Sequence, residues 1–344
     1  MHRILLVKPC CLGDALMATP VLRALHTAFP HAVIDVAVSP WAAPAFDGHP
    51  AVRRLIPYPE RPSLARIAAL ARQLTGESYD CALGLDRSPY VGALLWLSRI
   101  PIRAGLGSGW RGRFYTHPVQ PQPTQHETEV YLAVSRALGV PDRGLEPEYF
   151  VQPLARERMT ARTASLPRPR VVLHPGGAVN PGSRLLAKRW PPERFAHLAD
   201  QLVARFGATV VLVGGPTDRE AVEAVRRTAR ARLIDWSEEL AWEDLAALLA
   251  VADLFVGNDT GVGHLAAAVG TATVSIFGPT SPRRYRPLGR RSLVCAPPES
   301  WHSPTEQDLR RPFPVPTQHD IRRVTVEDVF NACCTLLESS GAPA

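Results

Sequence analysis

Short apolar runs and segments of helical periodicity alternate along most of the chain. Apolar runs of strand length occupy residues 3–8, 32–38, 79–85, 170–174, 208–213, 252–256 and 271–277. Apolar residues recur at helical spacing in residues 16–29, 64–74, 90–97, 127–138, 191–206, 218–229, 245–249, 264–269 and 326–337. This alternation predicts strands that are joined by helices.

Continuous apolar strands separated by helices are typical of parallel sheets covered on both faces. We therefore expect an α/β protein with two Rossmann-like, doubly wound domains that face each other across a cleft. The domains span residues 1–160 and 168–325, and a C-terminal helix follows at 326–338. The arginine- and proline-rich stretch 151–170 is interpreted as the linker, and the six prolines of 297–320 predict a surface loop.

The composition fits a packed cytoplasmic protein. With 344 residues, 46% hydrophobic and 21% charged, the chain suits two folded domains and not a disordered protein. It lacks the apolar run of about 18 residues that indicates a membrane-spanning helix. Its first residues predict a short strand and not a secretory signal.

The basic residues are divided unevenly between arginine and lysine. The chain has 39 Lys and Arg against 32 Asp and Glu, and only two of the basic residues, Lys8 and Lys188, are lysines. The net charge of +7 is compatible with a nucleic acid, an anionic acceptor or a membrane surface. No nucleic-acid motif is present, so we expect no nucleic-acid partner. Because arginine is so abundant, each lysine marks a position where a compact ammonium is favoured.

The cysteines form neither a zinc motif nor a disulfide framework. Two adjacent pairs occur among the six residues Cys10, Cys11, Cys81, Cys295, Cys333 and Cys334. No Cys-x-x-Cys spacing is present, which argues against a zinc site. A reducing compartment would keep the thiols free.

The first segment with candidate chemistry, residues 8–14 (KPCCLGD), joins the first strand to the first helix. Asp14 is placed at the mouth of that helix, where a carboxylate could take a proton from an attacking hydroxyl. Aspartate is also a favoured N-cap residue, so an ordinary helix cap explains Asp14 as well.

The second segment contains His174-Pro-Gly-Gly and, further on, Lys188-Arg-Trp-Pro. An ammonium beside a helix N-terminus suits a diphosphate. A surface lysine whose stem covers Trp190 is the alternative, and the scarcity of lysine weighs against it.

Two further segments follow strands and open helices. Residues 257–264 (GNDTGVGH) could bind an anion through the N–H groups of the next helix, with Thr260 and His264 as added donors. Residues 214–218 (GGPTD) place Asp218 where a carboxylate can hold ribose hydroxyls. Simple helix caps remain an alternative for both. The third glycine of the dinucleotide fingerprint is missing, which disfavours a nicotinamide cofactor.

The chain has no Asp-x-Asp pair, so the usual carboxylate clamp for a nucleotide-sugar metal is missing. It also lacks the phosphate-binding GxxxxGK[ST] loop, the GxSxG elbow and the HExxH helix. We therefore expect no metal and no cofactor.

Taken together, these motifs resemble glycosyltransferase family 9, the ADP-heptose–lipopolysaccharide heptosyltransferases. The resemblance covers roughly residues 1–296, through KPCCLGDALMATPVLRALHTAFPHAVIDVAV, HPG, KRWP, VLVGGPTDRE, GNDTGVGHLAAAVGT and SIFGPTSP in that order. It implies a GT-B fold with an N-terminal acceptor-binding and a C-terminal nucleotide-sugar-binding domain. The implied reaction is an inverting, metal-independent transfer of heptose from ADP-heptose to a hydroxyl of an anionic lipopolysaccharide inner-core acceptor. The implied location is the cytoplasm, with peripheral contact at the inner membrane.

The resemblance also implies roles for individual residues. Asp14 falls on the family's catalytic base and Lys188 on its phosphate-binding lysine. The segment around the donor diphosphate and sugar falls on Asp259, Thr260, Gly261 and His264. Asp218 falls on the acid that contacts the ribose.

The acceptor-binding candidates are basic residues of the first half. Arg111 and Arg113 lie in GSGWRGR, and Arg87 lies in LDRSPY. Lys8 joins them because it ends the first strand close to Asp14. Solvated surface charge explains the arginines as well.

Three other functions compete with this one. A GT-B transferase could use another nucleotide sugar, or a glycan or natural-product acceptor. A nucleotide-sugar binding protein without turnover would not need a base such as Asp14. A nicotinamide-dependent dehydrogenase is disfavoured by the missing glycine.

Overall fold

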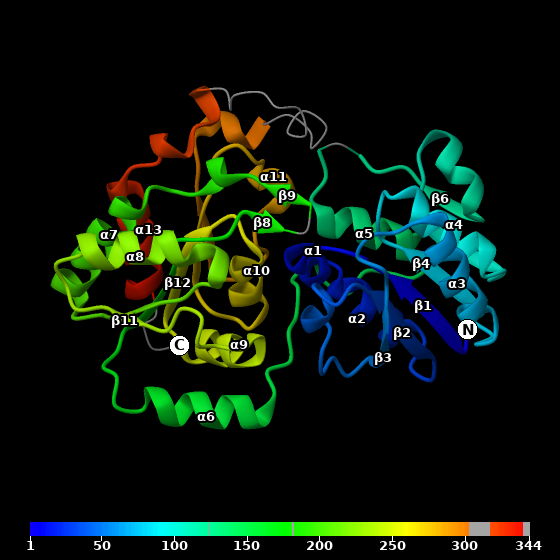
Figure 1. The fold of residues 1–344 in the computed structure, drawn as a ribbon, viewed down its shortest axis with the longest axis horizontal. Helices are drawn as coiled ribbons and strands as arrows, with labels where there is room; N and C mark the ends of the chain where they lie inside the picture. The colour runs from blue at the N-terminus through cyan, green and yellow to red at the C-terminus, as the bar shows by residue number, and fades with distance from the viewer. Residues whose placement is uncertain (123, 181, 303–316, 340–344) are drawn as a thin grey trace. The chain divides into compact units, whose positions relative to one another are not determined.

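The computed structural model describes residues 1–122, 124–180, 182–302 and 317–339, and the chain divides into two compact units, Met1–Phe150 and Val151–Ala344. Each unit contains one six-stranded parallel sheet with helices packed on it (Figure 1). The predicted α/β class with two Rossmann-like sheets is confirmed.

The first unit contains the three strands that the sequence pattern predicts and three more, at 52–57, 102–106 and 117–119, that it did not predict. Its strands are β1 (Arg3–Val7), β2 (Val33–Val38), β3 (Val52–Pro57), β4 (Cys81–Gly84), β5 (Ile102–Leu106) and β6 (His117–Val119). Its helices are α1 (Leu12–Met17), α2 (Thr19–Ala28), α3 (Leu64–Thr75), α4 (Pro89–Leu97) and α5 (Glu127–Arg136), with short 3-10 turns η1 (Ala43–Ala45) and η2 (Gly109–Phe114).

The second unit repeats this construction. Its sheet contains β7 (Arg170–His174), β10 (Thr209–Leu212), β11 (Ile234–Asp235), β12 (Leu254–Asn258), β13 (Thr273–Ile276) and β14 (Ser292–Cys295), and β8 (Val179–Asn180) and β9 (Ser183–Arg184) form a small hairpin. Its helices are α6 (Pro153–Thr163), α7 (Pro192–Phe206), α8 (Arg219–Thr228), α9 (Trp242–Val251), α10 (Gly261–Ala268), α11 (Pro282–Tyr285) and α13 (Val326–Glu338). Short 3-10 turns are η3 (Leu186–Lys188), η4 (Pro216–Asp218), η5 (Pro298–His302), η6 (Thr317–His319) and η7 (Ile321–Arg323).

Both sheets have the same strand order. It is β3-β2-β1-β4-β5-β6 in the first unit and β11-β10-β7-β12-β13-β14 in the second. In each, the chain leaves the central strand in one direction and later returns to its other side. Ligands of such sheets bind at the carboxyl ends of the two strands where the order reverses. These are β1 and β4 in the first unit, and β7 and β12 in the second.

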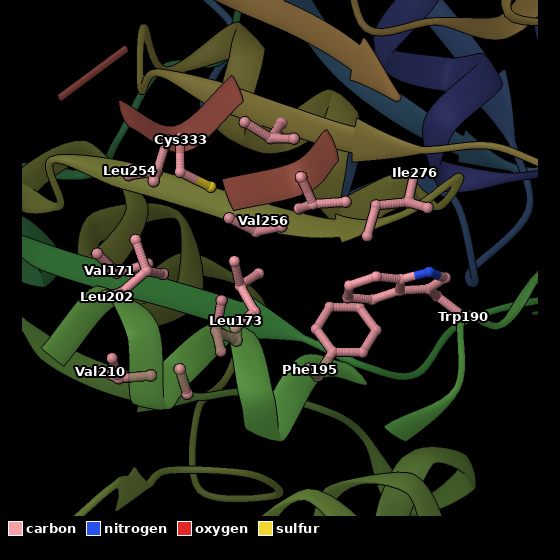
Figure 2. Close-up of a cluster of buried hydrophobic side chains, with 14 of the residues drawn as sticks. Val171, Leu173, Trp190, Phe195, Leu202, Val210, Leu254, Val256, Ile276 and Cys333 are labelled. Atoms are coloured by element: carbon pink, nitrogen blue, oxygen red, sulfur yellow. The ribbon is translucent and has the colours of Figure 1, made fainter. Parts of the chain in front are cut away.

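A continuous apolar core holds the second unit together. Residues of the central strands β7 and β12 pack against α7 on one face, and the core extends to α13 (Figure 2). Trp190 and Phe195 are fully buried and meet edge to face with ring centroids 5.1 Å apart. The indole N–H of Trp190 donates to the carbonyl of Val324 at 2.8 Å, so its one polar atom is satisfied.

Residues 151–170 differ from the sequence-based expectation. The stretch 151–170, interpreted as a linker, contains α6, which packs on α9 within the second unit. Residues 151–160, assigned by sequence to the first domain, therefore belong to the second unit. The three arginines of this helix mask its pattern because they are exposed, and Arg158 pairs with Asp244 on α9 at 2.6 Å.

The predicted proline-rich loop at 297–320 is described only at its ends, η5 and η6, and its residues 303–316 lie outside the described part of the chain. Within the described part, no helix has the length and apolar character needed to cross a bilayer.

Candidate active site

In the second unit, Lys188 lies in an ion pair at the carboxyl end of β12. Its ammonium donates to Asp259 Oδ2 at 2.7 Å, and the hydroxyl of Thr280 donates to the same oxygen at 2.7 Å. Asp259 is buried, while the Lys188 side chain keeps 21% of its surface exposed. Lys188 is therefore an ion-paired, mostly buried side chain and not a solvated surface lysine. The structure brings both predicted residues together.

Asn258 ties together the two loops that surround this ion pair. Its side-chain amide donates to the carbonyls of Pro175 and Gly176, at 3.0 and 2.9 Å. Its side-chain oxygen accepts from the backbone N–H of Trp190 at 2.9 Å. Because Asn258 is fully buried and all three bonds cross between loops, it fixes the ends of β7 and β12 against the entry of α7.

Glycine is required in the loop after β7. Gly177 has φ +90°, and a Cβ there would lie 2.0 Å from Thr260 Cγ2. A Cβ on Gly176 would lie 2.1 Å from the carboxyl carbon of Asp218. The side chains of Thr260 and Asp218 therefore occupy the space that these two glycines leave open.

Asp218 connects three loops of the second unit. Its carboxylate accepts from the backbone N–H of Gly177 at 2.8 Å and of Gly215 at 3.0 Å, and it pairs with Arg189 at 2.9 Å and His174 at 3.2 Å. Burial alone would raise the pKa of Asp218, but the His174 hydrogen bond and the other donors leave it far below the usual value. The geometry favours a role in holding these loops, and the predicted ribose contact stays a prediction.

Helix α10 begins at Gly261 without a side-chain cap. Thr260 occupies the N-cap position but makes no capping bond, and its hydroxyl lies 3.4 Å from His174 Nδ1. Thr260 therefore leaves the first N–H groups of α10 without a side-chain cap, which is the arrangement that binds an anion.

His264 lies inside α10 and is buried. Desolvation lowers its pKa to about 4, although the Asp259 carboxylate acts in the opposite direction. The imidazole is therefore neutral at pH 7 and carries no positive charge toward a ligand.

In the first unit, Asp14 lies in the first turn of α1 with a partly exposed carboxylate. Cys11, and not Asp14, occupies the N-cap position, so the alternative interpretation as a helix cap does not hold. The hydroxyl of Tyr131 on α5 donates to Asp14 Oδ1 at 3.2 Å. Burial, followed by the Asp14 charge, holds the pKa of Tyr131 well above its usual value, so the phenol stays protonated and keeps donating.

Lys8 lies directly after β1 and is almost fully buried. Its ammonium donates to the carbonyl of Cys10 at 3.1 Å, lies 3.5 Å from the Asp86 carboxylate and faces the ring of Tyr131. Burial alone would lower the pKa of Lys8, but the charges of Asp14 and Asp86 more than offset this and leave it raised. Lys8 is thus a buried cation that balances two carboxylates, and its predicted contact with an acceptor stays a prediction.

Two of the three candidate arginines lie together. Arg87 forms a two-pronged ion pair with buried Glu127 on α5, with distances of 2.9 to 3.1 Å. Arg111 donates to the carbonyl of Arg87 at 3.1 Å. Arg113 is exposed on the same turn, η2.

Sequence reasoning missed four residues that shape these clusters. They are Tyr131, Glu127, Asn258 and Thr280. Asn258 stood inside a recognised motif, and its amide beside Asp259 was the available signal. Thr280 also stood inside a recognised motif, SIFGPTSP. Nothing local marked Tyr131, which lies 117 positions from Asp14 in the chain. Among the described residues, no three His, Cys, Asp or Glu side chains are grouped to hold a metal ion.

Comparison with known proteins gives a consistent family assignment. The model of glycosyltransferase family 9 (heptosyltransferase) matches residues 67–312. Lipopolysaccharide heptosyltransferase 2 of Salmonella typhimurium is 28% identical over 360 residues, covering 98% of this chain and 99% of that protein.

Two solved structures share the fold. The family 9 glycosyltransferase of Veillonella parvula superposes with a TM-score of 0.83 at 24% identity, covering 98% of this chain and 97% of that one. The ADP-heptose lipopolysaccharide heptosyltransferase II of E. coli superposes with a TM-score of 0.79 at 24% identity, covering 99% and 100%. Because the family model spans most of the chain and both sheets have the fold of these enzymes, the chain belongs to glycosyltransferase family 9, the heptosyltransferases, and is a glycosyltransferase of GT-B fold.

Proposed function

We propose that this enzyme transfers heptose from ADP-heptose to a hydroxyl of an anionic lipopolysaccharide inner-core acceptor, with inversion at the anomeric carbon and without a metal. The observation that carries the donor side is the Lys188–Asp259 pair beside the uncapped start of α10. The similar proteins support both substrates, because the Salmonella relative is a lipopolysaccharide heptosyltransferase and the E. coli enzyme is an ADP-heptose heptosyltransferase.

The donor diphosphate is proposed to bind at the switch point of the second sheet. The N–H groups at the start of α10 and the ammonium of Lys188 would offset the charge that develops on the leaving phosphate. Asp259 and Thr280 hold the ammonium in place before the donor arrives. Asn258 fixes the two loops around the ammonium, so the groups that bind the diphosphate are already oriented.

Asp14 is proposed as the general base. A sugar hydroxyl is a poor nucleophile, and a carboxylate that takes its proton as the new bond forms lowers the barrier. Attack on the side opposite the departing ADP inverts the anomeric carbon. Tyr131 orients the carboxylate, whose charge in turn stabilises the buried ammonium of Lys8.

Arg111, Arg113 and Arg87 are proposed to face an anionic acceptor. A lipid-linked acceptor would place the enzyme peripherally at the cytoplasmic face of the inner membrane. The net charge of +7 supports contact with an anionic surface.

The donor is tested by nucleotide release. The protein is incubated with ADP-heptose, and separately with UDP-sugars, in the presence of lipid-A-core acceptors. We expect ADP release that depends on acceptor and persists in EDTA, and an inverted linkage in the product by NMR. Release from UDP-sugars alone would assign the enzyme to another donor.

The base assignment is tested with Asp14→Asn. We expect kcat to fall on the order of 100- to 10,000-fold, the usual contribution of general base catalysis. The dissociation constant of ADP-heptose, measured by calorimetry, should change little. Asp86→Asn is the matched control because Asp86 also faces Lys8 but is not proposed to touch substrate. Equal losses in the two variants would contradict a special role for Asp14.

A further inference from the structure

The adjacent cysteines Cys10 and Cys11 lie with their sulfurs in contact. The two Sγ atoms are 2.9 Å apart, and both residues are partly exposed thiols. They occupy the loop between β1 and α1, four and three positions before Asp14. The family motif does not explain them, because the proposed chemistry uses Asp14 and not a thiol.

Local backbone geometry brings the two sulfurs together. Successive side chains normally point to opposite faces of a strand or diverge around a helix. Cys11 instead has φ +70°, a conformation that residues other than glycine seldom adopt. The second adjacent pair, Cys333 and Cys334, lies in the regular helix α13, where Cys333 is buried and Cys334 is partly exposed. It therefore provides an internal comparison.

The backbone of this pair supports the residues proposed for catalysis. The carbonyl of Cys10 accepts from the ammonium of Lys8 at 3.1 Å. The carbonyl of Cys11 accepts from the N–H of Ala15 at 2.8 Å and so begins helix α1. Rotation of the peptide group between the two cysteines moves the Cys10 carbonyl away from Lys8. A change in the Cys11 backbone disturbs the turn closed by its carbonyl, and Asp14 lies in that turn.

The charges around the pair favour one thiolate at a time. The hydrogen bond from Cys11 lowers the pKa of Cys10, and the same contact raises the pKa of Cys11. The Lys8 ammonium favours a thiolate here, while the Asp14 and Asp86 carboxylates oppose it. A single thiolate beside a neighbouring thiol is the starting state for exchange with a disulfide.

We propose that Cys10 and Cys11 form a modification site for thiol–disulfide exchange, in which a low-molecular-weight disulfide converts them reversibly into a vicinal disulfide and disables the loop that carries Asp14. The loss of transfer activity rests on the proposed function, whereas the thiol chemistry does not.

The exchange proceeds in two balanced steps. The thiolate of Cys10 attacks one sulfur of the oxidant, whose S–S bond breaks, and one thiolate leaves. The Cys11 thiol then loses its proton and attacks the Cys10 sulfur, breaking the mixed disulfide and releasing the second thiolate. The two cysteines are oxidised by two electrons, and their two protons end on the two released thiols.

The geometry of a vicinal disulfide between Cys10 and Cys11 favours its reduction and does not favour a structural role. Adjacent Cα atoms are about 3.8 Å apart, below the roughly 4.4–6.8 Å span of ordinary disulfides. Strained disulfides are readily reduced, so a dithiol reductant should restore the starting state.

The chemistry is tested on the full-length protein with glutathione disulfide. After treatment, the peptide containing Cys10 and Cys11 should have lost two hydrogen atoms in mass, and dithiothreitol should restore them. The peptide with Cys333 and Cys334 should remain reduced. Stable glutathione adducts on Cys10 or Cys11, or no reaction at this peptide, would overturn the site.

The functional effect is tested by the ratio of oxidised to reduced transfer activity within each variant. We expect a fall of about tenfold or more in the wild type, since a misplacement of about 1 Å at a reacting group can cost on the order of 100-fold. The ratio should stay near one in Cys10→Ser and Cys11→Ser, and Cys334→Ser should behave like the wild type.

Two results separate this proposal from the proposed function. A vicinal disulfide that leaves the activity ratio unchanged, or a loss that persists in the serine variants, overturns the switch. If the reduced enzyme does not use ADP-heptose at all, the proposed function fails, while the mass change still decides whether the modification site exists.

Discussion

At Lys188, an ammonium and a guanidinium are not equivalent. The Lys188 Nζ reaches a single oxygen of Asp259 at 2.7 Å and shares it with Thr280. An arginine would present a planar fork that prefers both oxygens of a carboxylate. The presence of a lysine and not an arginine therefore has a structural reason at this position.

We predict that Lys188→Ala lowers kcat/KM for ADP-heptose on the order of 10- to 100-fold, because a hydrogen bond to a charged group contributes about 1.5–3 kcal/mol. Lys188→Arg should recover only part of this loss. Steady-state kinetics with ADP-heptose measure both effects. The control is Arg184→Ala, because Arg184 is an exposed residue of the same loop. Full activity of the arginine variant would show that the charge alone matters.

His264 makes the second unit sensitive to acid. Its folded-state pKa is about 4, lowered mainly by burial, against about 6.5 in an unfolded chain. The unfolded state therefore binds more protons below pH 6.5. The stabilising contribution is complete above that pH and is lost as the pH falls toward 4.

We predict that the second unit loses up to about 3 kcal/mol of stability from this group between pH 7 and pH 4. In His264→Gln this part of the pH dependence should be absent. Hydrogen exchange of the α10 amides, measured across that range, reports the difference. If the exchange rates of these amides depended on pH in the same way in the wild type and in His264→Gln, His264 would not be the source of the acid sensitivity.

At the scale of elements, α13 completes the core of the second unit. It begins with a capping box, in which Thr325 and Asp328 each accept a hydrogen bond from the other's backbone N–H at 3.1 and 2.8 Å. It packs on α7, β13 and β14, and Val329, Cys333 and Leu336 are buried there (Figures 1 and 2). It also contacts β12, whose carboxyl end carries the candidate donor site.

We predict that Leu336→Ala destabilises the second unit by about 2–4 kcal/mol, the cost of removing a buried leucine side chain. Exposed Thr335→Ala on the same helix should change stability by about 0.5 kcal/mol or less. Hydrogen exchange should show faster opening of β7 and β12, with β1 and β4 unchanged. Equal loss in both units would mean that their cores are not independent.

At the scale of the whole molecule, one sheet topology is used twice. In both units some of the candidate residues follow the strands at which the strand order reverses. Asp14 and Lys8 follow β1, and Asp259 follows β12. This placement explains why two clusters with unrelated chemistry occur in equivalent positions: in each sheet, the loops diverge there and leave the strand ends accessible.

Much of this fold was predictable from local patterns, and the exceptions have physical causes. Buried central strands such as β1 and β12 each contain an uninterrupted apolar run, ILLV in β1 and LFV in β12, so their sequences identify them. Strand β3 was missed because it lies at the sheet edge, where Arg53 and Arg54 pair with Asp35. Helix α6 was missed because its outward-facing arginines hide its short apolar face, which consists of Ala155 and Met159.

The amino-acid sequence by itself determined the repeated α/β architecture, the family motifs and the positions of Asp14 and Lys188, because each depends on residues close together in the chain. Only the tertiary structure decided their surroundings. The partners of Asp14 and Lys188 lie 117 and 71 positions away, and the charge state of Lys8 depends on carboxylates brought to it by folding. Contacts at such separations arise from strand pairing and helix packing, which no local pattern encodes.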